Sequence, residues 1–146
     1  MFRHMEREAV KLKIRSDYSE YTGPRYCIQG ASSGEEFYHT LLNASFVEAY
    51  QKGQHLIVDL DDTAGYLSSF LDEAFGNLIF DFSVEIVKPR LKIISIQEPD
   101  WETMIFNEVY SDWEKRRLNN VTPKKTADHP EWFKLIDNQL ISKIWI

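Results

Sequence analysis

An apolar run followed directly by a helical pattern constrains the fold of this chain more than any other feature. Residues 55–60 are nearly all apolar and β-prone, which predicts a central strand covered on both faces. After a short turn, apolar side chains recur along one face of a predicted helix, at Leu67, Leu71, Ala74, Phe75 and Leu78. The opposite face of that helix would carry the polar residues Asp72, Glu73 and Asn77. This strand–turn–helix unit, residues 56–78, predicts an α/β fold, and its turn is the best candidate for a functional surface.

Other segments continue the alternation of strands and helices. Strands are predicted by alternating or β-prone residues at 10–15, 25–28, 84–87 and 91–96. Helices are predicted from a capping box at 33–36 to a stop at Gly53, and from a cap at Asp100 to about Leu118. A last short helix is predicted at 129–131, while residues 141–146 fit either a helix or a terminal strand. Gly76, inside the helix that follows the turn, would allow that helix to approach the sheet closely.

These elements together predict the fold class and the domain organisation. The 146 residues suffice for one core, and we expect an α/β fold with a mixed sheet of four to five strands packed with helices. Residues 1–120 would form this domain, and residues 121–146 would form a C-terminal helical extension that packs on it or flanks it. No run approaches the ~18 apolar residues that span a bilayer, and the first residues lack a signal-peptide pattern. We therefore expect a cytoplasmic protein that does not enter the membrane.

Charge and residue usage exclude several function classes. The net charge of −6 argues against general nucleic-acid binding, although the chain from Trp113 onward carries +3 and the remainder −9. A nucleic-acid-associated accessory protein that uses this basic tail, with Lys115–Arg117 and Lys124–Lys125, is therefore an alternative. The single cysteine, Cys27, rules out an intrachain disulfide. The four histidines lack paired spacing, so we expect no metal and no cofactor, while a dyad of Cys27 with a histidine stays open.

The end of the apolar run carries a motif with chemical meaning. The segment from Asp59 to Thr63 has the form Asp-x-Asp-x-Thr and resembles the first motif of haloacid dehalogenase-like phosphatases. That resemblance implies that Asp59 is the nucleophile, that Asp61 is the general acid/base and that magnesium neutralises the charge. That family also needs a later lysine and a later acidic pair, and after Thr63 the chain has no Asp-Asp or Gly-Asp-x-x-x-Asp sequence that could supply the pair. A magnesium-dependent phosphatase is therefore kept only as an alternative.

A second resemblance takes in more of the same segment. Residues 58–60, a loop at 61–66 and the helix start at 67–71 resemble the STAS domain of anti-sigma-factor antagonists. In that family an Asp-Ser-Ser-Gly-Leu sequence begins the helix, and its first serine is phosphorylated. Matched in order, Ser68 falls on the phosphorylated serine and Ser69 on its neighbour. The chain departs from the pattern at both flanks, where Leu67 replaces Asp and Phe70 replaces Gly.

The STAS-like family of unknown function resembles the chain more closely. The similarity extends over residues 23–26, 33–37, 58–60 and 68–76, and the run from Ser68 to Gly76 is its most specific part. It implies a STAS-like α/β fold for roughly residues 10–118 and no settled activity.

The resemblance implies a bacterial signalling protein that is not an enzyme and works by partner switching. Its partner would be a protein, by analogy a GHKL-type (histidine-kinase-like) ATPase or anti-sigma-like kinase. The expected contact residues lie in the turn and the adjoining helix and are Asp61, Asp62, Thr63, Tyr66, Asp72 and Glu73. The phospho-acceptor candidates are Ser68 and Ser69. The alternative is plain helix capping by Ser69 with Asp72, with Ser68 merely adjacent.

Overall fold

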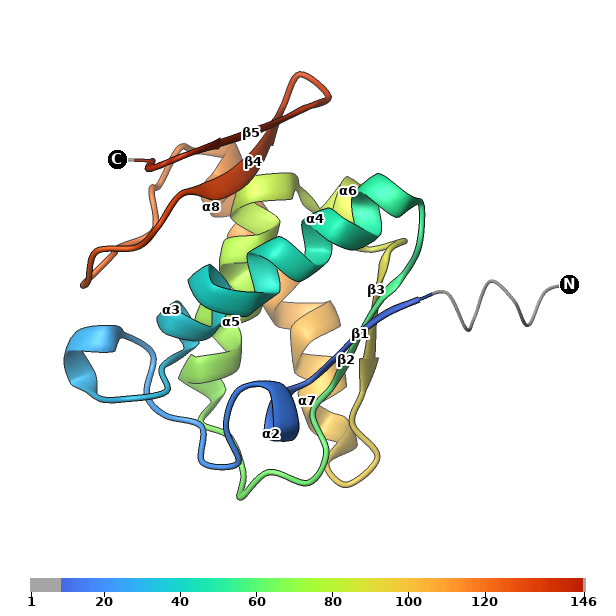
Figure 1. Ribbon diagram of the computed structural model, residues 1–146, viewed down its shortest axis with the longest axis vertical. Helices are drawn as coiled ribbons and strands as arrows, with labels where there is room; N and C mark the ends of the chain where they lie inside the picture. Colours follow the sequence, from blue (N-terminus) through green and yellow to red (C-terminus); the bar gives the residue numbers. More distant parts are fainter. Residues whose placement is uncertain (1–8, 146) are drawn as a thin grey trace, which may run out of the picture.

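The computed structural model describes residues 9–145 as a parallel sheet packed against helices, with a separate C-terminal hairpin (Figure 1). Strands β1 (Val10–Lys13), β2 (Leu56–Asp59) and β3 (Leu91–Ile94) pair in that order, with Leu12 beside Val58 and Val58 beside Ile93. Strands β4 (Trp132–Ile136) and β5 (Gln139–Lys143) form an antiparallel hairpin. The α/β class is confirmed. The predicted single mixed sheet of four to five strands is instead three parallel strands plus a two-stranded sheet.

Burial along the three parallel strands alternates. Leu12, Val58 and Ile93 are buried, whereas Lys11 and Lys92 are exposed and Ile57 is half-buried. Strand β2 is the central strand, as predicted. The prediction that both of its faces are covered is wrong for the described residues, because side chains that point to the second face keep contact with solvent.

Two long helical segments each contain one turn of π-helix. Ser33 caps the first of them by accepting a hydrogen bond from the Glu36 N–H at 3.0 Å, and Gly53 ends it in the left-handed region with φ 65°. This first segment consists of α3 (Gly34–Phe37), η2 (Tyr38–Leu42) and α4 (Asn43–Lys52). The second consists of α7 (Pro99–Met104), η3 (Ile105–Val109) and α8 (Tyr110–Leu118). Both long helices are confirmed, but Glu98 rather than Asp100 occupies the cap position of the second.

Several short segments differ from their predicted structure. Strand β1 ends at Lys13 because helix α2 (Ile14–Asp17) begins there, and residues 25–28 lead into a 3-10 helix, η1 (Cys27–Gln29), instead of a strand. Residues 84–87 are also helical, as α6 (Val84–Val87), because the Ser83 hydroxyl accepts a hydrogen bond from the Ile86 N–H at 3.3 Å. Four-residue apolar runs fit either structure, so local hydrogen bonds decide them.

The predicted helix at 129–131 and the helical C-terminal extension are wrong. The end of the described chain is the β4–β5 hairpin, so residues 141–143 are a strand. Its turn uses Asp137 and Asn138, which both have positive φ, 50° and 63°. Two successive left-handed residues twist in the same sense as the strands they join, so an Asp-Asn pair favours this hairpin.

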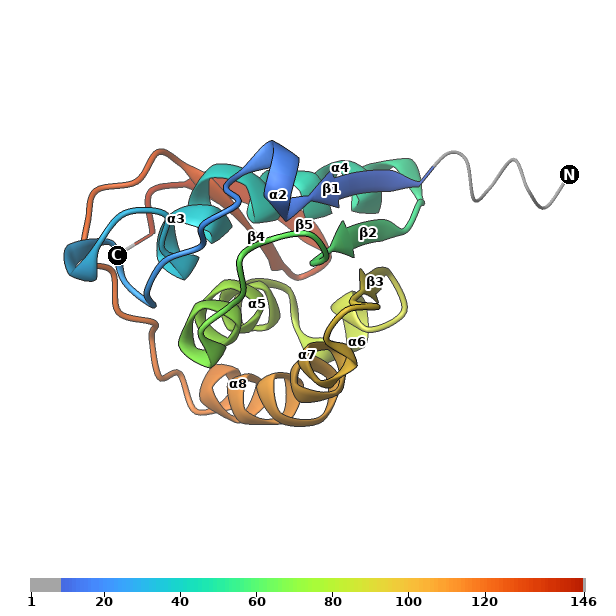
Figure 2. The same cartoon turned by 90° about the horizontal axis from the view of Figure 1, so that it is seen from below.

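Helix α5 (Ser68–Phe82) is surrounded by other elements. It lies between α8 on one side and α3 with strand β4 on the other (Figure 2). Its predicted polar face is wrong, since Glu73 and Asn77 are buried while Leu67, which precedes the helix, is exposed. Gly76 does allow a close approach, but to α8 rather than to the sheet, because a Cβ there would overlap the Trp113 indole. Among the residues that the structure describes, none of the helices combines the length and the apolar character of a membrane-spanning segment.

Candidate interaction site

The turn that connects β2 to α5, residues 60–67, lies at the carboxyl edge of the parallel sheet. Strands β2 and β3 both end at this edge because they run in the same direction. Ligands and partners of open α/β sheets bind at this edge, where loops leave the strands. In Figure 1 the turn lies at the lower end of the molecule, opposite the C-terminal hairpin. The sequence therefore placed the candidate surface where the fold favours one.

Asp59, the last residue of β2, and Asp61, in the turn, hold the loops together. The Asp59 carboxylate accepts a hydrogen bond from the Asp61 N–H at 2.9 Å and lies 3.3 Å from the Lys13 ammonium. The Asp61 carboxylate accepts backbone hydrogen bonds from Ile96 at 3.2 Å and Gln97 at 3.0 Å. Both carboxylates thus have structural partners, with Asp61 tying the turn to the segment after β3. This arrangement does not favour a nucleophile and an acid/base at these positions.

Asp62 and Thr63 make the turn rigid. Asp62 adopts φ 71°, and its carboxylate contacts the Lys13 ammonium at 2.9 Å and accepts from the Gln97 amide at 2.9 Å. The hydrogen bond from Lys13 holds the pKa of Asp62 below its ordinary value. The Thr63 hydroxyl accepts from the Gly65 N–H at 3.3 Å. A turn with this many internal bonds loses little conformational entropy when a partner binds.

Tyr66 forms one wall of a small pocket beside the turn. Its hydroxyl donates to the Leu60 carbonyl at 2.8 Å, and its ring meets Trp101 edge to face at 6.4 Å between centroids. The pocket has a volume of about 290 Å³ and is also lined by Ser95 and Glu98. Burial raises the pKa of Tyr66 to about 12, so the phenol stays protonated at neutral pH. The surface of the turn is therefore hollowed next to the charged residue Asp61.

The two serines occupy the first turn of α5. Ser68 is exposed and is the first helical residue, while Ser69 is half-buried. Leu67 stands at the cap position with φ −84° and ψ 140°, and no side chain forms a capping hydrogen bond there. The interpretation of Ser69 and Asp72 as a helix cap is therefore wrong. Ser68 has the exposure that a modification site needs.

Asp72 and Glu73 belong to a network between helices. One Arg25 nitrogen lies 2.7 Å from the Asp72 carboxylate and 3.1 Å from that of Glu73. Asp72 also accepts from the Trp113 indole N–H at 3.1 Å, and Glu73 accepts from the Asn77 amide at 2.9 Å. Burial raises the pKa of Glu73, although the bonds from Asn77 and Arg25 oppose this. Glu73 is 1% exposed and so cannot be a partner contact in this structure, while Asp72 is half-buried.

The structure also brings together a cluster that the sequence did not predict. Glu35 is buried and accepts hydrogen bonds from the Cys27 N–H at 3.0 Å and from the Thr126 N–H and hydroxyl at 2.9 and 2.6 Å. His129, 94 residues away in sequence, approaches the same carboxylate at 2.7 Å through Nε2 and stacks on His39 with ring centroids 4.0 Å apart. Local spacing could not reveal a pairing over such a separation.

The sequence predicts no metal site, yet this cluster brings together three residue types that commonly bind metal ions. Ligand atoms of Cys27, Glu35 and His129 lie within 4.8 Å of one another, a grouping that the acidic turn does not form in the described residues. Both Glu35 oxygens already accept hydrogen bonds, so the carboxylate has a structural role and holds the segment around Thr126 against α3. Burial raises the pKa of Cys27, which keeps the thiol protonated and disfavours a nucleophilic dyad with His129.

Most of the five basic residues named for the tail contact other side chains of the chain. Arg117 forms two hydrogen bonds to the Glu114 carboxylate, at 3.0 and 2.6 Å, and Arg116 stacks over the Trp113 ring at 4.0 Å. Lys124 lies 5.2 Å from the Tyr26 ring centroid. These contacts do not favour the alternative of a nucleic-acid-binding tail.

The chain thus forms an α/β fold with a structured, partly exposed turn at the carboxyl edge of its parallel sheet. Residues 33–101 match the family model described as a STAS-like domain of unknown function. This segment is therefore similar to a STAS-like domain, as the resemblance predicted, and the match spans β2, the turn, α5 and β3. No curated protein and no solved structure matches the chain.

Proposed function

We propose that this chain is a non-enzymatic regulatory module that binds a protein partner through the turn at 60–67 and the start of α5. The partner we propose is a GHKL-type ATPase or kinase, by analogy with STAS partner switching. The observation that carries the proposal is the exposed Ser68 at the start of α5, directly after Leu67, a residue that is 57% exposed.

The turn supports partner binding because it combines an exposed apolar side chain with polar side chains that hydrogen bonds hold in place. Leu67 offers apolar surface, and Asp62, in the same turn, is also exposed. The bonds from Lys13 and Gln97 hold the turn in one shape before a partner arrives. Preorganised surfaces with an apolar centre and a charged rim are typical of protein interfaces.

We further propose that phosphorylation of Ser68 switches the contact. The Ser68 hydroxyl would attack the γ-phosphorus of ATP held by the partner kinase, lose its proton and release ADP. The product adds about −1.5 to −2 charges. The helix N-terminus stabilises this charge, whereas Asp62, in the turn that leads to the helix, repels it. A partner surface that fits Leu67 and a neutral serine would then meet a dianion.

Binding to purified GHKL-type ATPases of the host organism tests the proposal. Each would be immobilised, and the affinity of the wild-type chain would be compared with that of Leu67→Asp and Ser68→Asp. We expect at least one ATPase to bind, Leu67→Asp to weaken binding about tenfold or more, and Ser68→Asp to change the affinity. Phosphate transfer from radiolabelled ATP should label the wild type and not Ser68→Ala.

Ile144→Asp is the matched control, since Ile144 is 60% exposed and follows the hairpin at the other end of the molecule (Figure 1). It should leave binding unchanged. The proposal fails if no GHKL-type ATPase binds, or if Ile144→Asp weakens binding as much as Leu67→Asp. Binding that is insensitive to Ser68→Asp would refute the switch alone.

A further inference from the structure

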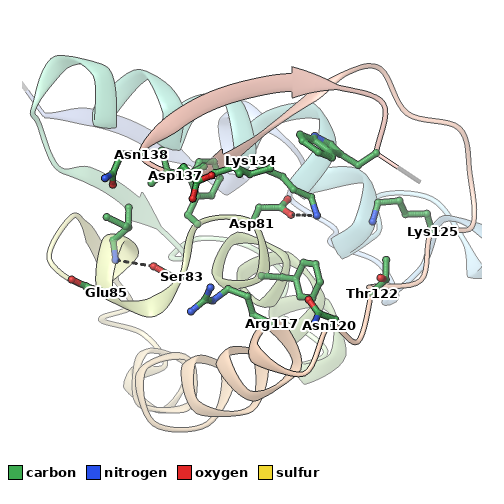
Figure 3. A pocket seen from close by; sticks show the side chains of 16 residues that line it. Asp81, Ser83, Glu85, Arg117, Asn120, Thr122, Lys125, Lys134, Asp137 and Asn138 are labelled. Atoms are coloured by element: carbon green, nitrogen blue, oxygen red, sulfur yellow. Dashed lines mark hydrogen bonds and ion pairs between the residues drawn. The ribbon is translucent and has the colours of Figure 1, made fainter.

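A second pocket lies under the C-terminal hairpin, away from the turn. Its volume is about 580 Å³, and its walls come from α5, α6, the end of α8, the connection at 120–125 and the hairpin (Figure 3). Pockets of this size accept small organic molecules. Apolar surface is supplied by Phe80, Ile86 and Trp145.

The carboxylate of Asp81 lines the floor of this hairpin pocket and is held in place by a hydrogen bond. Asp81 is buried, and its Oδ2 accepts from the Tyr38 hydroxyl at 2.6 Å, which in turn accepts from the Asn43 amide at 2.9 Å. The Lys134 ammonium lies 3.6 Å from Asp81 Oδ1 and 5.1 Å from the Trp145 ring centroid. Figure 3 shows this ion pair inside the cavity. Burial raises the pKa of Asp81 to about 6.

Lys125 is the cation of this pocket that lacks a carboxylate partner. Arg117 is neutralised by Glu114, and Lys134 is paired with Asp81. Lys125 is half-buried, and no carboxylate of the described residues lies within ion-pair distance of it. Its contacts are a 3.5 Å hydrogen bond to the Pro123 carbonyl and a 5.0 Å approach to the Trp132 ring centroid. Burial lowers the pKa of Lys125, although the negative charge of Asp81 opposes this shift.

We propose that the hairpin pocket binds a small organic anion, with its phosphate or carboxylate group at Lys125 and its apolar part against Phe80, Ile86 and Trp145. The anion supplies the counter-charge that Lys125 lacks, and Lys134 adds a second ammonium to the same cavity. Asp81 disfavours a ligand of high negative charge and so restricts the site to molecules with one anionic group. This site is independent of the proposed partner contact at the turn.

Phenyl phosphate, inorganic phosphate, benzoate and phenol are suitable probes. Binding would be followed by NMR through the indole N–H of Trp145, which donates to the Trp132 carbonyl at 2.9 Å. We expect phenyl phosphate or benzoate to bind with a Kd of about 1 mM or tighter, as suits a fragment of this size. Phosphate and phenol should each bind about tenfold more weakly, because phosphate lacks the apolar ring and phenol lacks the anionic group. The stronger of the two ring-bearing anions identifies the preferred anionic group.

Lys125→Met should weaken phenyl phosphate or benzoate binding about tenfold, and the adjacent Lys124→Met should leave it unchanged. Lys124 is the matched control because it is exposed and lies outside the pocket. In the wild type, raising the salt concentration should weaken anion binding and leave phenol unaffected, a result that does not depend on any variant folding. Equal effects of the two lysine variants, equal affinity for phenol, or no binding of either anion would overturn the proposal.

Discussion

Glu35 shows how much one buried residue contributes to this structure. Its side chain is 1% exposed, and its two oxygens accept hydrogen bonds from η1, from the Thr126 region and from His129. Burial alone would raise the pKa of Glu35, but the hydrogen bonds from Thr126, His129 and Cys27 outweigh it and lower the pKa to about 2. The ionised carboxylate therefore ties the C-terminal segment to α3.

We expect Glu35→Gln to lower the free energy of unfolding by about 2–3 kcal/mol at pH 7, because an amide cannot accept all of these bonds. Urea unfolding would measure the change, with the exposed Glu48→Gln as a control expected to change it by less than about 0.5 kcal/mol. The folded pKa lies below the ordinary value of 4.5, so this stabilisation is present above about pH 4.5 and is lost as the pH falls toward 2. The gap between wild type and variant should narrow over that range. A gap that is constant from pH 7 to pH 2.5 would contradict the assignment.

At the scale of elements, the packing of α5 on α8 depends on a glycine. A Cβ at Gly76 would overlap the Trp113 indole, whose N–H donates to Asp72 on the same helix α5. Helix propensity alone would make Gly76→Ala stabilising by about 1 kcal/mol. We expect the opposite sign, a loss of about 1–3 kcal/mol, because the indole must move in a packed interior.

Thermal and urea unfolding would check the Gly76 prediction, with Gln51→Ala at an exposed position of α4 as the control for propensity. Combining Gly76→Ala with Trp113→Leu should cost less than the sum of the two single changes, since the smaller side chain makes room for the methyl group. A Gly76→Ala variant more stable than the wild type would contradict the prediction, because it would show that the Trp113 indole makes room for a methyl group at little cost.

At the scale of the whole molecule, the C-terminal hairpin packs into the same core as the parallel sheet. Trp132 is 2% exposed, its ring meets His39 edge to face at 4.5 Å, and the hairpin contacts both α4 and α5. The core therefore combines residues inside the matched family segment with residues that follow it.

We expect Trp132→Ala to lower the free energy of unfolding by about 3–5 kcal/mol, and Ile144→Ala, at an exposed site, to change it by less than about 0.5 kcal/mol. Hydrogen exchange should show the hairpin amides and the α5 amides of the wild type opening in one cooperative event. If the hairpin exchanges independently and Trp132→Ala costs less than about 1 kcal/mol, the hairpin is an appendage rather than part of the core.

Features that depend on neighbours a few residues apart could be predicted from the amino-acid sequence alone. The apolar run of β2, the Ser33 cap, the Gly53 stop and the long helix that ends at Leu118 follow from local hydrogen bonds and side-chain spacing. The STAS-like resemblance rested on the same kind of local pattern and is supported by the match over residues 33–101.

Which side chains are available to a partner depends on the packing of the folded chain and could not be predicted from sequence. Glu73 looked like part of a polar helix face, yet Arg25 and the surrounding helices bury it, while Leu67 looked buried and is exposed. Glu35 meets His129 across 94 residues, and Lys125 enters a pocket under a hairpin that had been expected to be helical. Burial and long-range pairing depend on how the elements pack against one another, which local spacing does not encode.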